Sequence, residues 1–324
     1  MKRREVLTAL AALVAWPCPG RAQQSRKIAR IGFLGPGSAS NVAGVEIMRS
    51  GLRDLGYVEG KNITIEFRWA EGNYDRLPEL AEELVRLNVD VLVTYAVPGA
   101  LAAKQATTTI PIVMALSAEA VRLGLVAGLS RPGGNITGQT FFNPEINAKR
   151  LELLKEALPG SKRVAVLFNP KNQIVPSVLE AMELAAKSLN LELNQFAAGR
   201  SDELAAAFSG MGIQGAEALV VIDGPITFEM LGSIVELATA RRLPSIGQLE
   251  LAEAGGLMAY AADYSEMWRR TAVFVDKILK GARPDELPVE QPTRFKFVIN
   301  LKTANTLGLK IPNLLFARAD EVIE

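Results

Sequence analysis

The sequence predicts an α/β protein of two doubly wound lobes, each built on a parallel β-sheet. From Ile28 onward, short β-branched or apolar runs alternate with segments of helical periodicity, as in parallel strands joined by crossover helices. The run DVLVTYA is apolar almost throughout, which is typical of a strand covered by helices on both faces. The alternation restarts after Gly133-Gly134, and this indicates a second lobe of comparable size.

The first series of elements fills residues 28 to about 130. Its predicted strands are IARIGFLG (28–35), NITIEFRW (62–69), DVLVTYA (90–96) and IPIVMAL (110–116). One predicted helix carries Val45, Met48, Leu52 and Leu55 on a single stripe and closes at Gly56. The other predicted helices are LPELAEELVRLN (77–88), ALAAKQAT (100–107) and the short AVRLGLVAGL (120–129).

The second series begins after the glycines, with NITGQTFF (135–142) predicted to carry the chain from one lobe to the other. Its predicted strands are KRVAVLFNP (162–170), LELNQFA (191–197), EALVVIDGP (217–225), LPSIGQ (243–248) and GLMAYAAD (256–263). Its predicted helices cover 148–160, 175–190, 228–241 and 265–281, and residues 287–309 add an extended run and a short helix.

The first 22 residues have the pattern of an export signal that is removed from the mature protein. A basic start at residues 2–4 precedes an apolar run at 6–16, which is shorter than the roughly 20 residues that span a bilayer. Small residues before Gln23 supply a cleavage site, and Arg3-Arg4 permits a twin-arginine route without requiring it. We therefore expect a periplasmic protein whose mature chain does not insert into the membrane.

Composition excludes much of enzyme chemistry. The 324 residues contain no histidine, and the single cysteine, Cys18, lies in the signal, so histidine-dependent triads and zinc sites are excluded. Walker and Gly-x-Ser-x-Gly motifs are absent, and GFLGPG lacks the third glycine of a dinucleotide loop. A net charge of +1 argues against nucleic acid. We expect a monomer that is not an enzyme and has no cofactor or metal.

Loops at the carboxyl ends of the strands are the expected ligand site, because two facing lobes open these ends into one cleft. First-lobe hydroxyls and helix N-terminal amides suit a carboxylate, Asp223 could pair with an ammonium or a hydroxyl, and Tyr95, Phe141 and Phe142 could stack on an aromatic ligand. The candidate ligand-binding residues are Ser38, Asn41, Tyr95, Val97, Ser117, Ala118, Phe142, Asn143, Asn169, Asp223 and Gln248.

Several of these residues have a purely structural alternative. Ser38 and Asn41 could cap the following helix, Asn169 precedes a proline in a turn pattern, and Asp223 could form an Asx turn before Gly224-Pro225. Trp268 falls on the buried stripe of its helix, and we expect it to serve in packing.

Several strings resemble a known family across the whole chain, among them LSRPGGNITG, KRLELLKEALPGSKRVAVLFNP and the terminal ADEVIE. They are similar to exported substrate-binding proteins of ABC transporters related to the tryptophan/tyrosine uptake type. The resemblance implies a type I periplasmic binding fold, a hinge of three crossovers, and an amino acid, aromatic acid or similar small ligand. Glu119-Ala120-Val121 departs from the family's usual Asp-Pro-Val after the IPIV strand, so proline's rigid turn is lost beside Ser117.

On this basis we expect a first lobe of residues 28–140 and 264–283, and a second of residues 141–263 and 284–324. The expected function is capture of a small organic ligand between the lobes and its delivery to an ABC permease. A sensory module that passes occupancy to a membrane receptor is the alternative. A transcription regulator of the same architecture would need a DNA-binding helix pair where the export signal stands.

Overall fold

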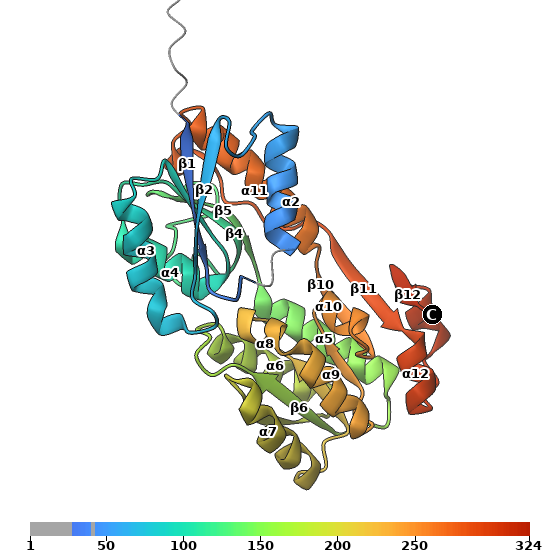
Figure 1. Ribbon diagram of the computed structural model, residues 1–324. Helices are drawn as coiled ribbons and strands as arrows, with labels where there is room; N and C mark the ends of the chain where they lie inside the picture. Colours follow the sequence, from blue (N-terminus) through green and yellow to red (C-terminus); the bar gives the residue numbers. More distant parts are fainter. Residues whose placement is uncertain (1–27, 40–42) are drawn as a thin grey trace, which may run out of the picture.

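The computed structural model describes residues 28–39 and 43–324, so the predicted export signal and Asn41 lie outside the described residues. The described chain forms two α/β lobes, the first at the top of Figure 1 and the second below it, with the C-terminus in the second. Within these residues, no helix is both long enough and apolar enough to cross a bilayer.

The first lobe is built on a sheet of parallel strands in the order β2-β1-β3-β4-β5. These strands are β1 (Ala29–Gly35), β2 (Ile63–Trp69), β3 (Val91–Thr94), β4 (Ile112–Ala118) and β5 (Ile136–Phe141). The helices of this lobe are α2 (Ala43–Asp54), α3 (Leu77–Arg86), α4 (Ala96–Ala106) and α11 (Tyr264–Leu279), with short 3-10 turns at Tyr74–Arg76 and Pro284–Glu286.

Alternate residues of β3 explain why its sequence is apolar throughout. Val91 and Val93 face the core formed with α2 and α11, whereas Leu92 faces the core formed with α3 and α4. Helix α11 follows β10 of the second lobe in the sequence, but it packs on α2 and β4 of the first lobe. The first lobe is therefore completed by a helix that comes after most of the second lobe in the sequence.

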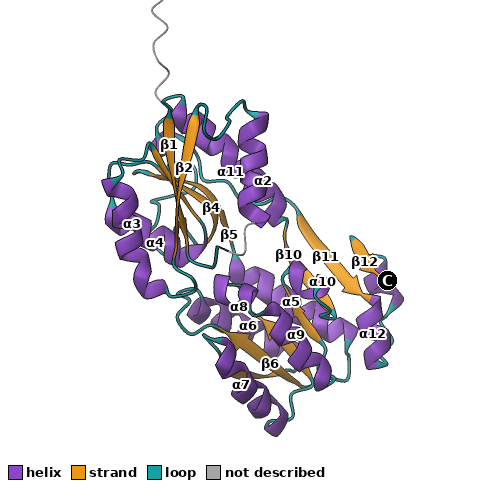
Figure 2. Cartoon of the chain, viewed as in Figure 1, coloured by secondary structure: helices purple, strands orange, loops and turns teal. Residues whose placement is uncertain are grey.

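The second lobe holds a larger sheet in the order β12-β11-β10-β9-β8-β6-β7. Its strands are β6 (Arg163–Phe168), β7 (Glu192–Ala197), β8 (Ala218–Val221), β9 (Ser245–Gly247), β10 (Met258–Ala262), β11 (Phe295–Asn300) and β12 (Glu321–Ile323). Its helices are α5 (Asn143–Ala157), α6 (Val175–Leu189), α7 (Ser201–Ile213), α8 (Pro225–Glu229), α9 (Leu231–Ala240), α10 (Leu249–Glu253), α12 (Leu301–Leu307) and α13 (Asn313–Phe316). Figure 2 shows these helices on both sides of the sheet.

In the described chain, the backbone passes between the lobes three times. It leaves the first sheet between β5 and α5, returns between β10 and α11, and crosses again before β11, which pairs antiparallel with β10. Before this last crossing, Val289 donates to the Leu129 carbonyl and Thr140 donates to the Glu290 carbonyl, so this segment runs beside β5. We propose that the lobe boundary follows Glu290 instead of lying at residue 284.

Two local predictions are wrong. AVRLGLVAGL forms a series of turns instead of a helix, because Glu119 and Gly124 take positive φ angles of 51° and 65° that interrupt helical geometry. The helix expected over 228–241 is two helices, α8 and α9, which meet at Met230. Gly133 (φ 70°) therefore follows a turn instead of ending a helix, but β5 does carry the chain out of the first lobe as predicted.

Candidate functional site: a cavity between the lobes

A cavity of about 190 Å³ lies where the carboxyl ends of the strands in the two lobes face each other. The first lobe contributes the start of α2, the β3–α4 junction and the end of β4, and the second contributes the loop after β8 and the β9–α10 junction. The first turns of α11 close a further side. This is the position that the strand-end argument predicts for a ligand.

Most of the predicted site residues line this cavity, and others do not. Those that do are Tyr95, Val97, Ser117, Ala118, Asn143, Asp223 and Gln248. Phe142 does not, because its side chain is 48% exposed and faces a separate surface hollow beside Phe295. Asn169 does not line the cavity either, and its Oδ1 accepts the backbone N–H of Lys171 at 3.0 Å, which fits the turn expected at Asn169-Pro170. Ser38 lies at a contact between the lobes, described below.

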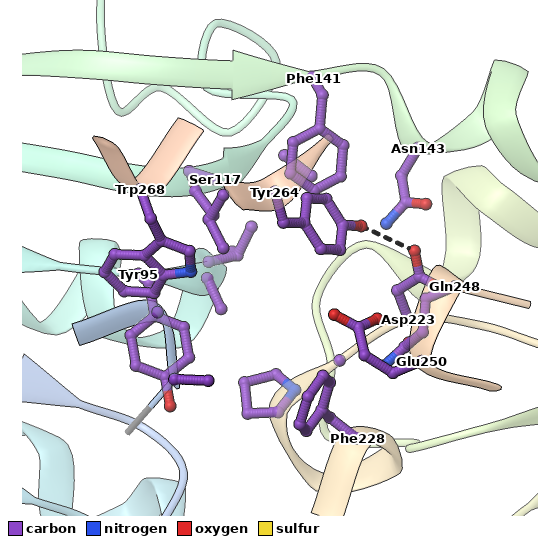
Figure 3. A pocket seen from close by; sticks show the side chains of 18 of the residues that line it. Tyr95, Ser117, Phe141, Asn143, Asp223, Phe228, Gln248, Glu250, Tyr264 and Trp268 are labelled. Atoms are coloured by element: carbon purple, nitrogen blue, oxygen red, sulfur yellow. Dashed lines mark hydrogen bonds between the residues drawn. The ribbon is translucent and has the colours of Figure 1, made fainter. Parts of the chain in front are cut away.

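Aromatic side chains form much of the cavity wall. Tyr95 and Trp268 meet edge to face with ring centroids 5.5 Å apart, and Phe228 lies across the space from them in Figure 3. Gly44 makes this arrangement possible, because a Cβ at that position would lie 2.2 Å from the Trp268 indole. Trp268 is buried in the core of the first lobe, as expected, and it also lines the cavity.

Asp223 is held by a buried arginine that the sequence did not single out. Arg150, 0% exposed, donates from Nη1 and Nη2 to the two carboxylate oxygens of Asp223 at 2.7 and 3.0 Å. The Tyr264 hydroxyl donates to Asp223 Oδ2 at 2.9 Å, which links α11 to the second lobe. Burial and the adjacent carboxylate raise the pKa of Tyr264 well above its ordinary value. The Asp223 carboxylate, which also lines the cavity, is therefore paired with a buried cation of this protein.

Three buried polar atoms of the wall have no hydrogen-bond partner among the described residues. They are Ser117 Oγ from β4, Gln248 Oε1 from the N-cap of α10, and Glu250 Oε2 from its first turn. Burial, with smaller contributions from Asp223 and Glu253, raises the pKa of Glu250 to about 7. Because unpaired buried polar atoms are costly, a ligand that bonds to them would recover free energy on binding. Sequence reasoning missed Glu250, although it lies two residues beyond the predicted Gln248.

Residues 31–323 match the family model described as ABC transporter substrate binding protein. The chain belongs to this family. A tyrosine-binding protein from Clostridioides difficile (strain R20291) is 27% identical over 274 residues, which cover 83% of this chain and 79% of that protein. The crystal structure of a conserved domain protein from Vibrio cholerae O1 biovar El Tor has a TM-score of 0.84 and 29% sequence identity. The match covers 91% of this chain and 100% of that one.

The crystal structure of an ABC domain in complex with L-Trp from Streptococcus pneumoniae also has a TM-score of 0.84, with 27% identity, and the match covers 91% of this chain and 99% of that one. These comparisons agree with the two-lobe type I periplasmic binding fold that the sequence predicts.

In this substrate-binding protein, polar contacts join the two lobes around the cavity. The Ser38 backbone N–H in the first lobe donates to the Glu229 carboxylate in α8 of the second. Ser177 in α6 donates to Glu119 Oε2 at 2.8 Å, beside β4. Lys171 pairs with Asp75 at 2.9 Å, although both groups are largely exposed, so this pair is worth little. The lobes are therefore in a closed arrangement around the cavity. Glu119, which stands where the resembled family usually has Asp, makes one of the contacts between the lobes.

The raised pKa of Glu250 leads to a prediction about stability and pH. The unfolded chain releases this proton near the ordinary value of 4.5 whereas the folded chain holds it to about 7, so the stabilising contribution of the proton is lost as pH rises between these values. As pH rises from 5 to 8, the wild type should lose about 2–3 kcal/mol in free energy of unfolding through this group, and Glu250→Gln should not show this loss. Urea unfolding of both proteins at the two pH values measures this, and parallel pH profiles would contradict it.

No group of three or more acidic, histidine or cysteine side chains in residues 28–39 and 43–324 gathers closely enough to hold a metal ion. Polar contacts from the wall come instead from hydroxyl, amide and carboxylate groups. The arrangement is thus suited to binding a small organic molecule by hydrogen bonds and aromatic contact.

Proposed function

We propose that the protein captures an aromatic amino acid in the interlobe cavity and delivers it, unchanged, to an ABC permease. The observation that carries the proposal is the cavity itself, in which Tyr95, Trp268 and Phe228 surround a space whose buried polar atoms still need partners. Aromatic side chains that face one another across such a space favour a planar apolar ligand group. The similarity to a tyrosine-binding protein and to a domain in complex with L-Trp supports the same ligand class.

Delivery requires that ligand binding shift the equilibrium between the open and closed arrangements of the two lobes. Contacts made to both lobes favour the closed arrangement, because a ligand shifts a conformational equilibrium only through its different affinities for the two states. We propose that the closed, ligand-bound monomer in the periplasm is the form that docks on the permease. The export pattern of residues 1–22 supports this location.

A thermal-shift panel tests the ligand class. Tryptophan, tyrosine and phenylalanine at 1 mM should raise the melting temperature of the protein by mass action, whereas alanine and glucose should not. Mass spectrometry of the recovered ligand should return it unchanged. Uptake of the labelled amino acid, in cells with and without the gene, separates delivery to a permease from sensing. A panel in which none of the aromatic amino acids shifts the melting temperature would overturn the proposal.

Phe228→Ala should weaken binding of the best aromatic amino acid about tenfold, since one aromatic contact contributes about 0.5–1.5 kcal/mol beyond its buried area. Phe228 is only partly buried, so the fold should tolerate the change. Calorimetric titration measures the affinity. Phe295→Ala is the matched control, because Phe295 is also a part-exposed aromatic of the second lobe but does not line the cavity. Equal affinities for the two variants would contradict a role for Phe228 in stacking.

A further inference from the structure

The charge of the described cavity wall comes from one residue. Asp223 and Glu250 are the acidic side chains among the described lining residues, and no lysine or arginine is among them. Arg150, which lies behind the wall, neutralises Asp223 through two hydrogen bonds. Among the described residues no cation forms an ion pair with Glu250, although the charge of Arg150 acts to lower its pKa, and its Oε2 is buried without a partner there. The wall therefore presents one uncompensated carboxylate to whatever fills the cavity.

Gln248 provides a second acceptor next to this carboxylate. Its Oε1 is also buried and unpartnered within the described chain, and the residue is 2% exposed at the N-cap of α10. Two neighbouring acceptors call for a group with several N–H donors, and an ammonium supplies three. On the basis of the proposed function, we propose that Glu250 and Gln248 bind the protonated amine of the ligand, so that the site selects amino acids over aromatic acids.

The first lobe supplies what the carboxylate of such a ligand needs. Ser117 is 1% exposed, and its Oγ has no partner among the described residues. Helix α4 begins nearby at Ala96, which lines the cavity, and no described side chain caps its N-terminus. A helix N-terminus and a free hydroxyl both favour an anion. Figure 3 shows Ser117 on one side of the cavity and Glu250 on the other. A zwitterion would thus bond to one lobe at each end and favour closure.

The charged and titratable groups around Glu250 determine how binding depends on pH. They are Asp223 after β8, Arg150 in α5, Tyr264 in α11, and Glu253 in α10 itself. Burial raises the pKa of Glu250 to about 7, and a ligand ammonium beside it would lower that pKa. Binding then releases a proton, so affinity should rise about tenfold between pH 6 and pH 8, where the ligand ammonium stays charged.

A ligand series on the wild-type protein tests the inference without any substitution. Tryptophan and tyrosine are compared by calorimetric titration with indole-3-propionate and 3-(4-hydroxyphenyl)propionate, which keep the ring and the carboxylate but lack the amine. We expect the two acids to bind roughly 10- to 100-fold more weakly than the amino acids, because a hydrogen bond to a charged group is lost. Acids that bind as tightly as the amino acids would overturn the inference and leave the proposed function standing.

Substitution then identifies the residue. Glu250→Gln should bind tryptophan roughly 10- to 100-fold more weakly and lose the dependence on pH between 6 and 8. Glu253→Gln is the matched control, because Glu253 is an exposed glutamate of the same short helix and does not line the cavity, and it should keep wild-type affinity within about twofold. If Glu250→Gln bound tryptophan as tightly as the wild type does, Glu250 would not be the residue that binds the ligand amine, and the inference would be overturned. Failure of the wild type to bind any of the four compounds would overturn the proposed function together with the inference.

Discussion

Replacing Arg150 with methionine should lower the free energy of unfolding by about 3–5 kcal/mol, because it leaves the Asp223 carboxylate in a buried site without its cation. Methionine fills much of the volume of the arginine stem, so the loss comes mainly from electrostatics and from unpaired acceptors. These acceptors include the Tyr260 carbonyl, which Arg150 Nε bonds at 2.8 Å, and the Asn147 side chain. Urea unfolding at pH 7 measures the change.

Two further variants separate the cause from a general effect of losing an arginine. Arg269→Met removes an arginine from a largely exposed pair with Asp54 and should change stability by no more than about 0.5 kcal/mol. The double variant Arg150→Met/Asp223→Leu should recover much of the loss, because a buried ion pair can be replaced by apolar groups at small cost. A loss below about 1 kcal/mol in Arg150→Met, or no recovery in the double variant, would contradict the expectation.

This network changes what a substitution at Asp223 would report. If Asp223 only faced the ligand, its replacement by alanine would weaken ligand binding much more than it altered stability. In the structure, the same change leaves the Arg150 guanidinium buried and removes the acceptor of the Tyr264 hydroxyl. A large loss of stability is therefore expected as well. Asp223 is better described as a residue that positions Tyr264 and Arg150 at the cavity edge.

The fold and much of the cavity wall could be predicted from the sequence because both follow from local pattern. Alternating strands and helices specify the two sheets, and the carboxyl ends of parallel strands must open together. Tyr95, Ser117 and Gln248 follow from that rule alone, and all three line the cavity. Applied to the strand at Met258–Ala262, the same rule would have drawn attention to Tyr264, directly after the crossing into α11.

The remaining site residues depend on contacts between distant parts of the chain, which no local pattern contains. Arg150 lies 73 positions before its partner Asp223, in a helix whose sequence shows only ordinary helical periodicity. Trp268 falls on the buried stripe of α11, and only the packing of that helix against the first lobe turns part of the stripe toward the cavity. The turns at 120–129 follow from the positive φ at Glu119, and the residue type does not favour that conformation.

Gly138→Ala should be among the most damaging single substitutions in the protein, with an expected loss of roughly 3–5 kcal/mol in free energy of unfolding. Gly138 lies in β5, within the stretch that carries the chain between the lobes, and its φ of 122° strongly favours glycine. A Cβ at this position would lie 2.3 Å from the Met114 carbonyl oxygen and 2.6 Å from the Met114 nitrogen. Both are backbone atoms of the neighbouring strand, so the clash cannot be relieved by a side-chain rotation.

The position of this glycine links the strand to the ligand site. Strands β4 and β5 pair in register at Met114 and Gly138, and the register shifts between Met114 and Ser117. Such an irregularity re-aims the side chains that follow it, and Ser117, the next paired residue, lines the cavity. Pushing β5 away from β4 should therefore also weaken tryptophan binding in whatever fraction of Gly138→Ala remains folded.

Gly134→Ala is the matched control for this variant. Gly134 lies four residues earlier in the same stretch, a Cβ there would meet no described heavy atom within 4 Å, and its φ is not in the left-handed range. Stability within about 0.5 kcal/mol of the wild type is expected, since a compatible glycine-to-alanine change acts mainly on the unfolded chain. Urea unfolding and calorimetric titration compare the two variants. If both behaved alike, the close approach of β4 and β5 at Gly138 would not be what positions Ser117 at the cavity.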